Sequence, residues 1–448
     1  MKVLHLPFTY YPDPVGGTEV YVAGLASSLS RYGIVSVIAA PSSDAASTRY
    51  DHDGVLVFRY ANEPNGDIEA AYGSPDAVAA QAIGEIIDEI EPDVVHMHAL
   101  TSAVSVEALR AARSRGVATV FTYHTPAVSC IRGTLLHNGS EICDGALIAT
   151  RCSACMLDRH GVPPLARELL ARTPERLQAL THRVLPIRRI ETALRIPQLT
   201  EMRHDLVRAT LAEADVIVAV CQWVREVLLR IGADARRVVL SRQGTALTHP
   251  QPRMTRRATL PLKLAFVGRL DATKGLHVVL DAIANLPGIP ISLDVYGVAQ
   301  GESGERYLEQ ARARVKGDAR VRFRRPLEHH DVVPALSGYD ATLVPSQWLE
   351  TGPLVVLESF GAGTPVIGSQ LGGIEELVRN GWDGILVKHD DVSAWSDLFS
   401  RLVRSPSVLD ELRANVAPPR TMDDVARDMA ALYESIAELP IAMSRGIR

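Results

Sequence analysis

Short runs of valine, isoleucine and leucine alternate with helical stretches along almost the whole chain, and this alternation occurs twice. Strands that are buried on both faces read as continuous apolar runs, and helical crossovers between them produce parallel sheets. We therefore expect an α/β protein with two doubly wound, Rossmann-like domains. The expected strands are Val3–Leu6, Val35–Ala39, Val94–His96, Val117–Thr122, Val216–Val220 and Val238–Leu240, then Leu264–Val267, Ile291–Tyr296, Val321–Phe323, Ala341–Val344, Val366–Gly368 and Ile385–Val387.

A segment with few core residues separates the two sets of strands. Residues 245–261 carry three prolines and two adjacent arginines, a composition typical of an interdomain linker. We predict a first domain over residues 1–248, a linker over 249–261, a second domain over 262–420 and a closing helix within 421–448. Because ligands of doubly wound sheets bind at the carboxyl ends of strands, we expect the active site in a cleft between the domains.

Residues 128–206 show no evident strand and form an expected insertion in the first domain. The insertion contains four cysteines, followed from Pro164 onward by an amphipathic helical stretch rich in arginine. Four thiolates can hold a structural zinc ion, although a disulfide pair or free thiols also fit this irregular spacing. The candidate zinc ligands are Cys130, Cys143, Cys152 and Cys155.

Charge and hydropathy exclude several classes of protein. The formal net charge of −5 argues against a nucleic-acid-binding protein, which would carry a basic domain. The first residues lack the apolar run of a signal peptide, and no segment approaches the roughly 18 apolar residues of a membrane span. We expect a cytoplasmic protein. The arginine-rich helical stretch is either a basic surface that contacts the inner face of the membrane or a solvated helical cap.

A loop with two cations follows the strand expected at Leu264–Val267. Gly268 and Arg269 end this strand, and Lys274 and Gly275 precede the next helix. A lysine at a helix start is disfavoured by the helix dipole, so we favour anion binding over a solvated loop. Two such cations would stabilise a departing diphosphate, and each preorganised donor contributes on the order of 2.7–4 kcal/mol in such chemistry.

Two carboxylates flank a Gly-Pro turn that opens an apolar helix. Gly352 and Pro353 start the helix at Leu354, and a proline in the first turn leaves the following N–H groups free to face a phosphate. Glu350 lies on the loop, where it can face a sugar. Glu358 is surrounded by apolar residues and can accept ribose hydroxyls. The alternative is that Glu350 only interacts with the helix dipole and that Glu358 is an ordinary surface residue.

Gly16 and Gly17 follow the first expected strand and precede a helix, where glycine lets a backbone approach a phosphate. The spacing differs from that of the dinucleotide-binding fingerprint, which argues against a dehydrogenase. His124 lies just past another strand, where it would either bond a sugar hydroxyl or cap its loop. We expect His96 and His98 on alternate faces of a strand, His96 in the core and His98 near the cleft, so that they would not share an ion.

The chain resembles family 4 glycosyltransferases of the GT-B fold, also called glycosyltransferase group 1. The resemblance covers nearly everything outside residues 128–206. The stretches that carry it are Gly16-Gly17, His124, Ala214–Cys221, Gly268-Arg269 with Lys274-Gly275, Glu350 with Glu358, Gly363–Gly368, Gly372-Gly373 and Gly381–Gly384. Two stretches depart from the family pattern. Ser241–Gly244 replaces a common Pro-Asn-Gly, and Arg324-Arg325 replaces a glycine, which could narrow the nucleotide pocket.

The resemblance implies a residue for each part of the donor. Arg269 and Lys274 would bind the diphosphate, Glu358 the ribose, Glu350 the donor sugar and His124 the transferred sugar near its anomeric carbon. The family retains anomeric configuration, needs no catalytic metal and lets the leaving phosphate help to deprotonate the acceptor. The closing helix would cross back to the first domain.

We therefore expect a glycosyltransferase that moves a hexose-type sugar from a UDP- or GDP-sugar bound by the second domain. The first domain would bind a carbohydrate, lipid-linked or small-molecule acceptor. Loops such as the one at Tyr296 would contribute to donor recognition. The alternatives are a nucleotide-sugar-binding protein without catalytic activity and a nucleotide-sugar epimerase of the same fold.

Overall fold

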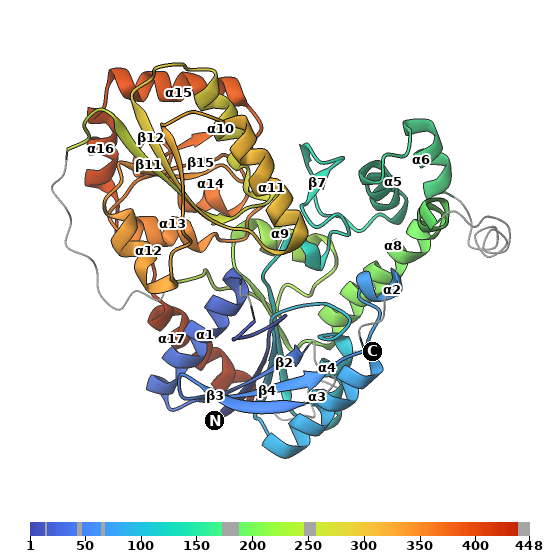
Figure 1. The fold of residues 1–448 in the computed structure, drawn as a ribbon. Coiled ribbons are helices and arrows are strands. Elements are labelled where there is room, and N and C mark those ends of the chain that lie inside the picture. Colours follow the sequence, from blue (N-terminus) through green and yellow to red (C-terminus); the bar gives the residue numbers. More distant parts are fainter. Residues whose placement is uncertain (14–15, 43–46, 64–67, 173–187, 246–256, 438–448) are drawn as a thin grey trace. The chain divides into compact units, whose positions relative to one another are not determined.

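The computed structural model describes residues 1–13, 16–42, 47–63, 68–172, 188–245 and 257–437 (Figure 1). The chain forms two compact units. The first comprises Met1–Arg242 with Met422–Arg448, and the second comprises Gln243–Thr421. Most of the linker predicted over 249–261 lies outside the described residues. Within the described part of the chain, no helix combines the length and the apolar character that crossing a membrane would require.

An eight-stranded sheet forms the centre of the first unit, in the order β10-β9-β6-β5-β1-β2-β4-β3. Its strands are β1 (Lys2–Leu6), β2 (Val35–Ser42), β3 (Thr48–His52), β4 (Val55–Ala61), β5 (Val94–Met97), β6 (Ala118–Tyr123), β9 (Val216–Ala219) and β10 (Val238–Leu240). All neighbours pair in parallel except β3 with β4. The six strands predicted for this unit are confirmed. The strand order reverses between β1 and β5, and such reversals mark ligand sites in doubly wound sheets.

The β3–β4 hairpin was not predicted from the sequence. Asp53 and Gly54 form its turn with φ angles of 52° and 79°. An Asp-Gly pair with positive φ at both residues is the usual signal of a two-residue hairpin. The strand before the turn is polar and has no buried residue, so the apolar pattern did not reveal it.

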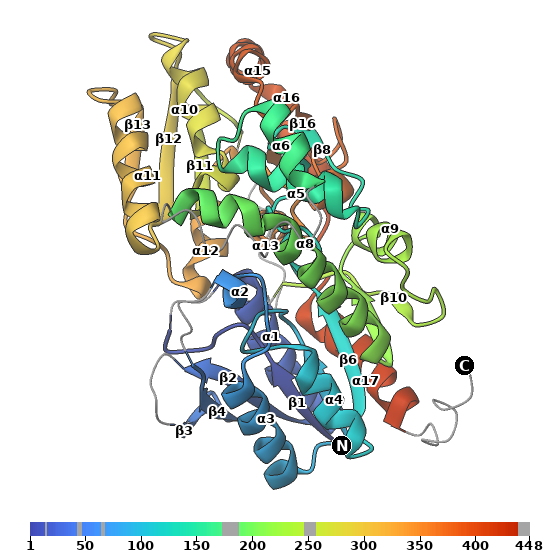
Figure 2. The same cartoon turned by 90° about the vertical axis from the view of Figure 1, so that its right-hand side faces the viewer.

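The first unit has helices that cover its sheet and, in the insertion, two helices that pack with a long helix in a separate apolar core (Figures 1 and 2). They are α1 (Gly17–Leu29), α2 (Ile68–Ala71), α3 (Ala77–Ile90), α4 (Val106–Ser114), α5 (Ala149–Arg159), α6 (Pro164–Ala171), α8 (Arg188–Glu213), α9 (Gln222–Arg230) and α17 (Met422–Ala437), with 3-10 turns η1 (Ser30–Tyr32) and η2 (Pro126–Val128). The expectation of no strand in residues 128–206 was wrong, because β7 (Leu136–His137) and β8 (Glu141–Ile142) pair there. Strands of two residues are too short to show a period.

The last helix, α17, packs on the first unit although it follows the second unit in sequence (Figure 1). Its buried residues Val425, Met429 and Tyr433 share one apolar core with Val22 and Leu25 of α1. Apolar burial of this kind contributes about 25 cal/mol per Å². Packing of α17 therefore stabilises the first unit, whose sheet carries His124.

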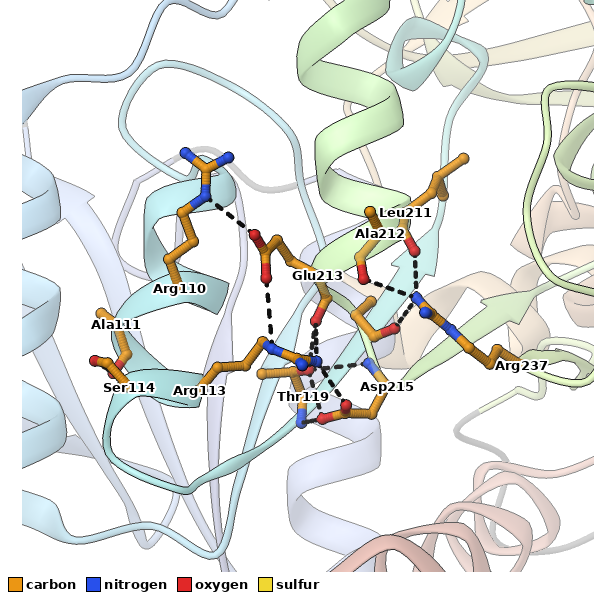
Figure 3. Close-up of polar contacts among 11 residues, drawn as sticks. Arg110, Ala111, Arg113, Ser114, Thr119, Leu211, Ala212, Glu213, Asp215 and Arg237 are labelled. Atoms are coloured by element: carbon orange, nitrogen blue, oxygen red, sulfur yellow. Dashed lines mark hydrogen bonds and ion pairs between the residues drawn. The ribbon is translucent and has the colours of Figure 1, made fainter. Parts of the chain in front are cut away.

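Charged groups tie the amino ends of β6 and β9 to α4 and α8 (Figure 3). Arg113 Nη1 donates to Asp215 Oδ1 at 2.8 Å, and Asp215 Oδ2 accepts the Thr119 N–H at 2.9 Å. Arg237 donates to three backbone carbonyls around the end of α8. These bonds satisfy backbone groups that the helix end would otherwise leave without partners.

The second unit is a six-stranded parallel sheet in the order β13-β12-β11-β14-β15-β16, which confirms the six predicted strands. Its elements are β11 (Leu262–Arg269), β12 (Ile291–Val298), β13 (Val321–Arg324), β14 (Ala341–Val344), β15 (Val366–Ser369) and β16 (Gly384–Val387), with η3 (Ala272–Lys274), α10 (Leu276–Ala284), α11 (Gly301–Arg314), α12 (His329–Leu336), α13 (Leu354–Gly361), α14 (Gly373–Leu377), α15 (Val392–Arg404) and α16 (Ser407–Asn415).

Alternate residues of β11 enter different cores, as the two-residue period of a strand requires. Leu264 and Phe266 pack with α10, α11, α15 and α16, while Ala265 and Val267 pack with α12. Both faces of the sheet are therefore covered. The strand order reverses between β11 and β14, so the loops after these two strands are the expected ligand-binding loops.

Candidate functional site

The loops after β11 and β14 meet at the reversal point of the second unit's sheet. The Gln347 N–H donates to the Thr273 carbonyl at 2.6 Å and joins the two loops. Gly275 has a φ of 71°, and a Cβ at this position would lie 1.8 Å from the carbonyl oxygen of Pro345. Only glycine fits here, because a side chain would push the loops apart.

This meeting point brings Lys274 and Glu350 together, although they are 76 residues apart in sequence. Lys274 Nζ lies 2.6 Å from Glu350 Oε1, and the Ser346 hydroxyl donates to the same oxygen at 2.8 Å. Lys274 Nζ also lies 5.3 Å from the centre of the Trp348 ring. Glu350 is buried, with 5% of its surface exposed. Both charges were predicted to belong to the site, but their contact with each other was not predicted.

Two glycines hold the backbone of Glu350 in place. The N–H of Gly373, at the start of α14, donates to the Glu350 carbonyl at 2.6 Å. A Cβ at Gly373 would lie 2.7 Å from that carbonyl oxygen, and one at Gly372 would lie 3.0 Å from it. The predicted glycine pair therefore lets α14 approach the loop that carries Glu350.

Arg269 lies at the end of β11 and stays accessible, with 43% of its side chain exposed. Its Nε lies 3.5 Å from Asp271 Oδ2, while Asp271 Oδ1 accepts the Thr273 N–H and caps η3. Gly268 precedes Arg269 in β11 and pairs with Gly297 of β12. An exposed guanidinium near the Lys274 loop can turn toward an anion.

Glu358 is buried in α13, which begins at Leu354 directly after Gly352 and Pro353. Burial raises its pKa to about 7. His329 Nδ1 of α12 lies 3.4 Å from Glu358 Oε1, and burial lowers the pKa of this histidine. Glu358 is therefore not an ordinary surface glutamate, and near neutral pH it exchanges a proton readily.

Tyr296, which we expected near the donor, belongs to an internal network. Its hydroxyl lies 2.7 Å from that of Tyr339, which donates to Asp294 Oδ2 at 2.8 Å. Arg324, a departure from the family pattern, pairs with Asp294 Oδ1 at 2.9 Å. The ion pair with Asp294 holds the Arg324 side chain against β12.

In the first unit, Gly16 and Gly17 begin α1 as expected. The Gly16 N–H, however, donates to Glu19 Oε2 at 2.8 Å. A carboxylate of the same helix thus occupies the N–H that we expected to face a phosphate. A phosphate at this position would have to displace Glu19.

His124 directly follows β6 and is buried with 4% exposure. Its Nε2 lies 3.1 Å from His98 Nδ1. Burial lowers the pKa of His124 to about 3, so the imidazole is neutral at physiological pH. His124 was a predicted site residue, but its contact with His98 was not predicted.

Our expectation that His96 and His98 would be kept apart was wrong. Residues two apart along a strand point to the same face, and the two ring centres lie 3.9 Å from each other. Among the described residues, His5, His96 and His98 form a group whose ligand nitrogens lie within 4.8 Å of one another. His96 belongs to the core, as predicted, with 0% of its surface exposed.

Comparison with known families identifies the chain. Residues 16–243 match the glycosyl transferase 4-like domain, and residues 252–418 match the glycosyl transferases of group 1. The first match alone covers more than half of the chain. The chain belongs to the GT4-type glycosyltransferase family.

Curated members of this family match only part of the chain. A D-inositol 3-phosphate glycosyltransferase of Mycobacterium tuberculosis is 34% identical over 200 residues, which cover 43% of this chain and 42% of the relative. A protein of the same name from Corynebacterium urealyticum is 31% identical over 186 residues, or 40% and 44% of the two chains. The matched stretch thus spans less than half the length of either relative.

Solved structures confirm the GT-B fold of this family member. The sucrose-phosphate synthase of Thermosynechococcus elongatus has a TM-score of 0.67 at 18% identity and covers 97% of this chain and 98% of its own. At these identities the likeness concerns the fold alone. It confirms two Rossmann-like units with parallel sheets.

The four cysteines of the GT4-type chain do not gather as the three histidines do. In the described part of the chain, the ligand atoms within 4.8 Å of one another belong to the histidine group. Cys155 Sγ accepts the Asn138 N–H at 3.2 Å. Burial raises the pKa of Cys152 to about 12, and Cys130 adds to this effect.

Proposed function

We propose that this chain transfers a hexose-type sugar from a nucleoside-diphosphate sugar to a hydroxyl of a carbohydrate, lipid-linked or small-molecule acceptor, with retention of anomeric configuration. The observation that carries the proposal is the contact of Lys274 Nζ with Glu350 Oε1 at 2.6 Å, at the reversal point between β11 and β14. A cation and a sugar-binding carboxylate at one point suit a diphosphate attached to a sugar.

In this proposal each side chain acts on one part of the donor. Lys274 and Arg269 bind the diphosphate, which leaves as the bond between the anomeric carbon and the phosphate oxygen breaks. Gly352, Pro353 and Leu354 place the amino end of α13 toward the same diphosphate. Glu350 binds hydroxyls of the sugar and Glu358 those of the ribose.

The acceptor oxygen forms the new bond to the anomeric carbon on the face that the diphosphate leaves. The proton of the acceptor hydroxyl passes to the departing diphosphate, so charge and atoms balance. His124 of the first unit donates to or accepts from a hydroxyl of the transferred sugar. No step requires a metal ion.

A thermal-shift screen of UDP-, GDP- and ADP-sugars against the full chain tests which base and which sugar the donor carries. A solved structure of similar fold, HepE of Anabaena with UDP-glucose, has a TM-score of 0.64 at 14% identity and covers 97% of this chain and 100% of its own. We expect at least one uridine or guanosine diphosphate sugar to raise the melting temperature. If no nucleotide stabilises the chain, the proposal fails.

If Glu358 binds the ribose, donor affinity should depend on pH. Because burial holds the free carboxyl at a pKa of about 7, ribose hydroxyls that donate to it must bind its ionised form. Donor binding then lowers this pKa, and donor affinity rises with pH. Between pH 6 and pH 8 we expect about a tenfold increase in affinity for the matching sugar nucleotide.

Isothermal titration calorimetry at the two pH values measures this change. A sugar nucleotide carries a diphosphate diester that does not titrate in this range. The ligand itself therefore does not make the affinity depend on pH. Glu358→Gln is the matched control and should bind with an affinity independent of pH. An equal slope in wild type and Glu358→Gln would remove Glu358 from the ribose site.

A lipid-linked acceptor would require contact with the membrane surface, and α6 offers an apolar face for it. Leu165 and Leu169, one turn apart, are 84% and 74% exposed, and Arg172 follows with a side chain 72% exposed. We expect the chain to float with vesicles of anionic phospholipid at low salt. Leu165→Gln with Leu169→Gln should abolish flotation, while Leu56→Gln, a change at an exposed leucine of β4, should not. Flotation that survives the α6 changes would exclude this surface.

We also propose, from the sequence, that Cys130, Cys143, Cys152 and Cys155 hold a structural zinc ion. Metal analysis of the purified chain tests it. Close to one zinc per chain, lost in Cys155→Ser, is the expected result. Metal-free, folded protein would contradict it.

A further inference from the structure

An aromatic ring lies beside the contact of Lys274 with Glu350 in the second unit. Trp348 belongs to the loop between β14 and α13, two residues before Glu350. Lys274 Nζ lies over the ring of Trp348, 5.3 Å from the ring centre, and 2.6 Å from Glu350 Oε1. A cation over an aromatic face and within about 6 Å of the ring centre is attracted by the negative face of the ring. One loop therefore holds the ammonium through two different contacts.

Backbone contacts set the position of this ring relative to Lys274. The N–H of Gln347, the residue before Trp348, donates to the carbonyl of Thr273, the residue before Lys274, at 2.6 Å. The side-chain Nε2 of Gln347 also donates to the Pro345 carbonyl at 2.8 Å. The two loops are thus joined directly beside the two side chains that meet. The place of the ring over the ammonium therefore follows from the backbone of both loops.

Within the described part of the chain, core packing and hydrogen bonding do not account for this tryptophan. Trp348 is half-buried and joins none of the apolar clusters of the second unit. Its indole Nε1 is buried and has no hydrogen-bond partner among the described residues. A tryptophan with a purely structural role usually packs in a core and pairs its N–H, because a buried donor without an acceptor is costly. The contact with Lys274 is the interaction that accounts for an aromatic residue at this position.

An aromatic face restrains an ammonium without neutralising it. An ammonium has three N–H donors, and Glu350 Oε1 accepts from the ammonium of Lys274. A second carboxylate would accept another donor and would reduce the positive charge of the site. The indole face attracts the charge but carries no net charge of its own, so the remaining donors stay available to a phosphate. Trp348 can thus hold Lys274 in place before a ligand binds.

We propose that Trp348 is a positioning residue that holds the Lys274 ammonium where the diphosphate of the donor binds. The inference rests on the proposed function for the role of Lys274. A lysine side chain loses rotamer freedom when a ligand fixes it, and this loss corresponds to roughly ten- to thirtyfold in affinity. A ring that already restrains the side chain removes part of this loss before the diphosphate arrives.

Calorimetry with UDP and GDP measures the effect of Trp348 on the diphosphate site. We expect Trp348→Phe, which keeps an aromatic face, to bind the nucleoside diphosphate within about threefold of the wild type. Trp348→Leu should bind it roughly three- to tenfold more weakly. Trp382→Leu is the matched control, because Trp382 is exposed and its ring lies 5.8 Å from the guanidinium carbon of Arg379 instead. This control should leave the affinity unchanged, and equal affinity in wild type and Trp348→Leu would overturn the proposal.

A double-mutant cycle with Lys274→Met separates a positioning role from a general structural one. Methionine keeps most of the apolar length of lysine but has no charge. If Trp348 acts through the ammonium, adding Trp348→Leu to Lys274→Met should change the affinity for UDP or GDP by less than about twofold. A loss of the same size with and without the lysine would show that Trp348 shapes its loop and does not act through Lys274.

The position of Lys274 can also be observed without a ligand. Aromatic rings shift the proton signals of groups above their faces to lower frequency, and the chain is poor in lysine, so lysine labelled with carbon-13 gives a simple spectrum. We expect the ε-methylene protons of Lys274, identified by their absence in Lys274→Met, to be shifted in the wild type and to return to the ordinary lysine position in Trp348→Leu. An unshifted wild-type signal would refute the role of Trp348 alone. If neither UDP nor GDP binds the folded wild type, the proposed function and the role of Lys274 fail together.

Discussion

Lys274→Ala is expected to lower the rate of sugar transfer by two to three orders of magnitude. The substitution removes an ammonium that we assign to the leaving diphosphate, and loss of one such donor typically costs about 2.7–4 kcal/mol in the transition state. Nucleoside diphosphate alone should also bind more weakly, by roughly 10- to 100-fold, because a charge-assisted hydrogen bond is lost. Steady-state kinetics and calorimetry measure the two effects.

Glu350→Gln distinguishes the role of Glu350 from that of Lys274. Lys274 Nζ contacts Glu350 Oε1 at 2.6 Å, so a diphosphate must compete with this carboxylate for the lysine. Neutral glutamine should therefore leave nucleoside diphosphate affinity equal or higher while transfer falls. Lys263→Ala, at an exposed lysine near the amino end of β11, is the matched control and should change neither. Equal loss of affinity in Lys263→Ala and Lys274→Ala would refute a specific diphosphate site.

The first unit is expected to lose about 5 kcal/mol of stability between pH 7.5 and pH 5.5. His5, His96, His98 and His124 are buried, and burial lowers the pKa of each below its usual value of 6.5. The folded unit therefore keeps them neutral while the unfolded chain takes up protons as the pH falls through 6.5. The free energy of unfolding is therefore highest above pH 6.5 and falls below it. The loss is about 1.4 kcal/mol per histidine over these two pH units.

Hydrogen exchange of the β1, β5 and β6 amides in urea measures the stability of this unit at the two pH values. His5→Phe removes one titrating group, so its pH-dependent loss should be smaller than that of the wild type by about one quarter. This comparison holds even if the variant is less stable at both pH values. Equal stability of the wild type at pH 7.5 and pH 5.5 would show that these histidines are not kept neutral.

The fold was predictable because its signal is local. Strands such as β11 and β14 are continuous apolar runs, and the alternation with helices determines the class of sheet. Edge elements were not predictable in this way. The β3 strand is polar and has no buried residue, and the β7–β8 hairpin has only two residues per strand.

The candidate site was predictable as a set of residues but not as a set of contacts. Burial of Glu358 follows from its apolar neighbours in sequence. The contact of Lys274 with Glu350 requires knowledge that β11 and β14 are neighbours, which depends on sheet order. The bond from Gly16 to Glu19 was local and could have been predicted, because a glutamate three residues after a helix start commonly bonds back to it.

The contacts among the buried histidines were missed for a related reason. His5 and His96 are register partners on adjacent strands, and His124 reaches His98 from a third strand. Residues 5, 98 and 124 carry no shared motif in sequence. A two-residue period along β5 could have placed His96 and His98 on one face, and that was the available signal.

The most direct test of the proposed function is the release of nucleoside diphosphate from sugar nucleotides, measured together with the mass of the acceptor. With the donor that stabilises the chain and a panel of carbohydrate and lipid-linked acceptors, we predict one nucleoside diphosphate released for each acceptor that gains one sugar. Glu350→Gln should show neither product at the wild-type rate. A folded, donor-binding wild type that releases no nucleoside diphosphate with any acceptor would contradict the account.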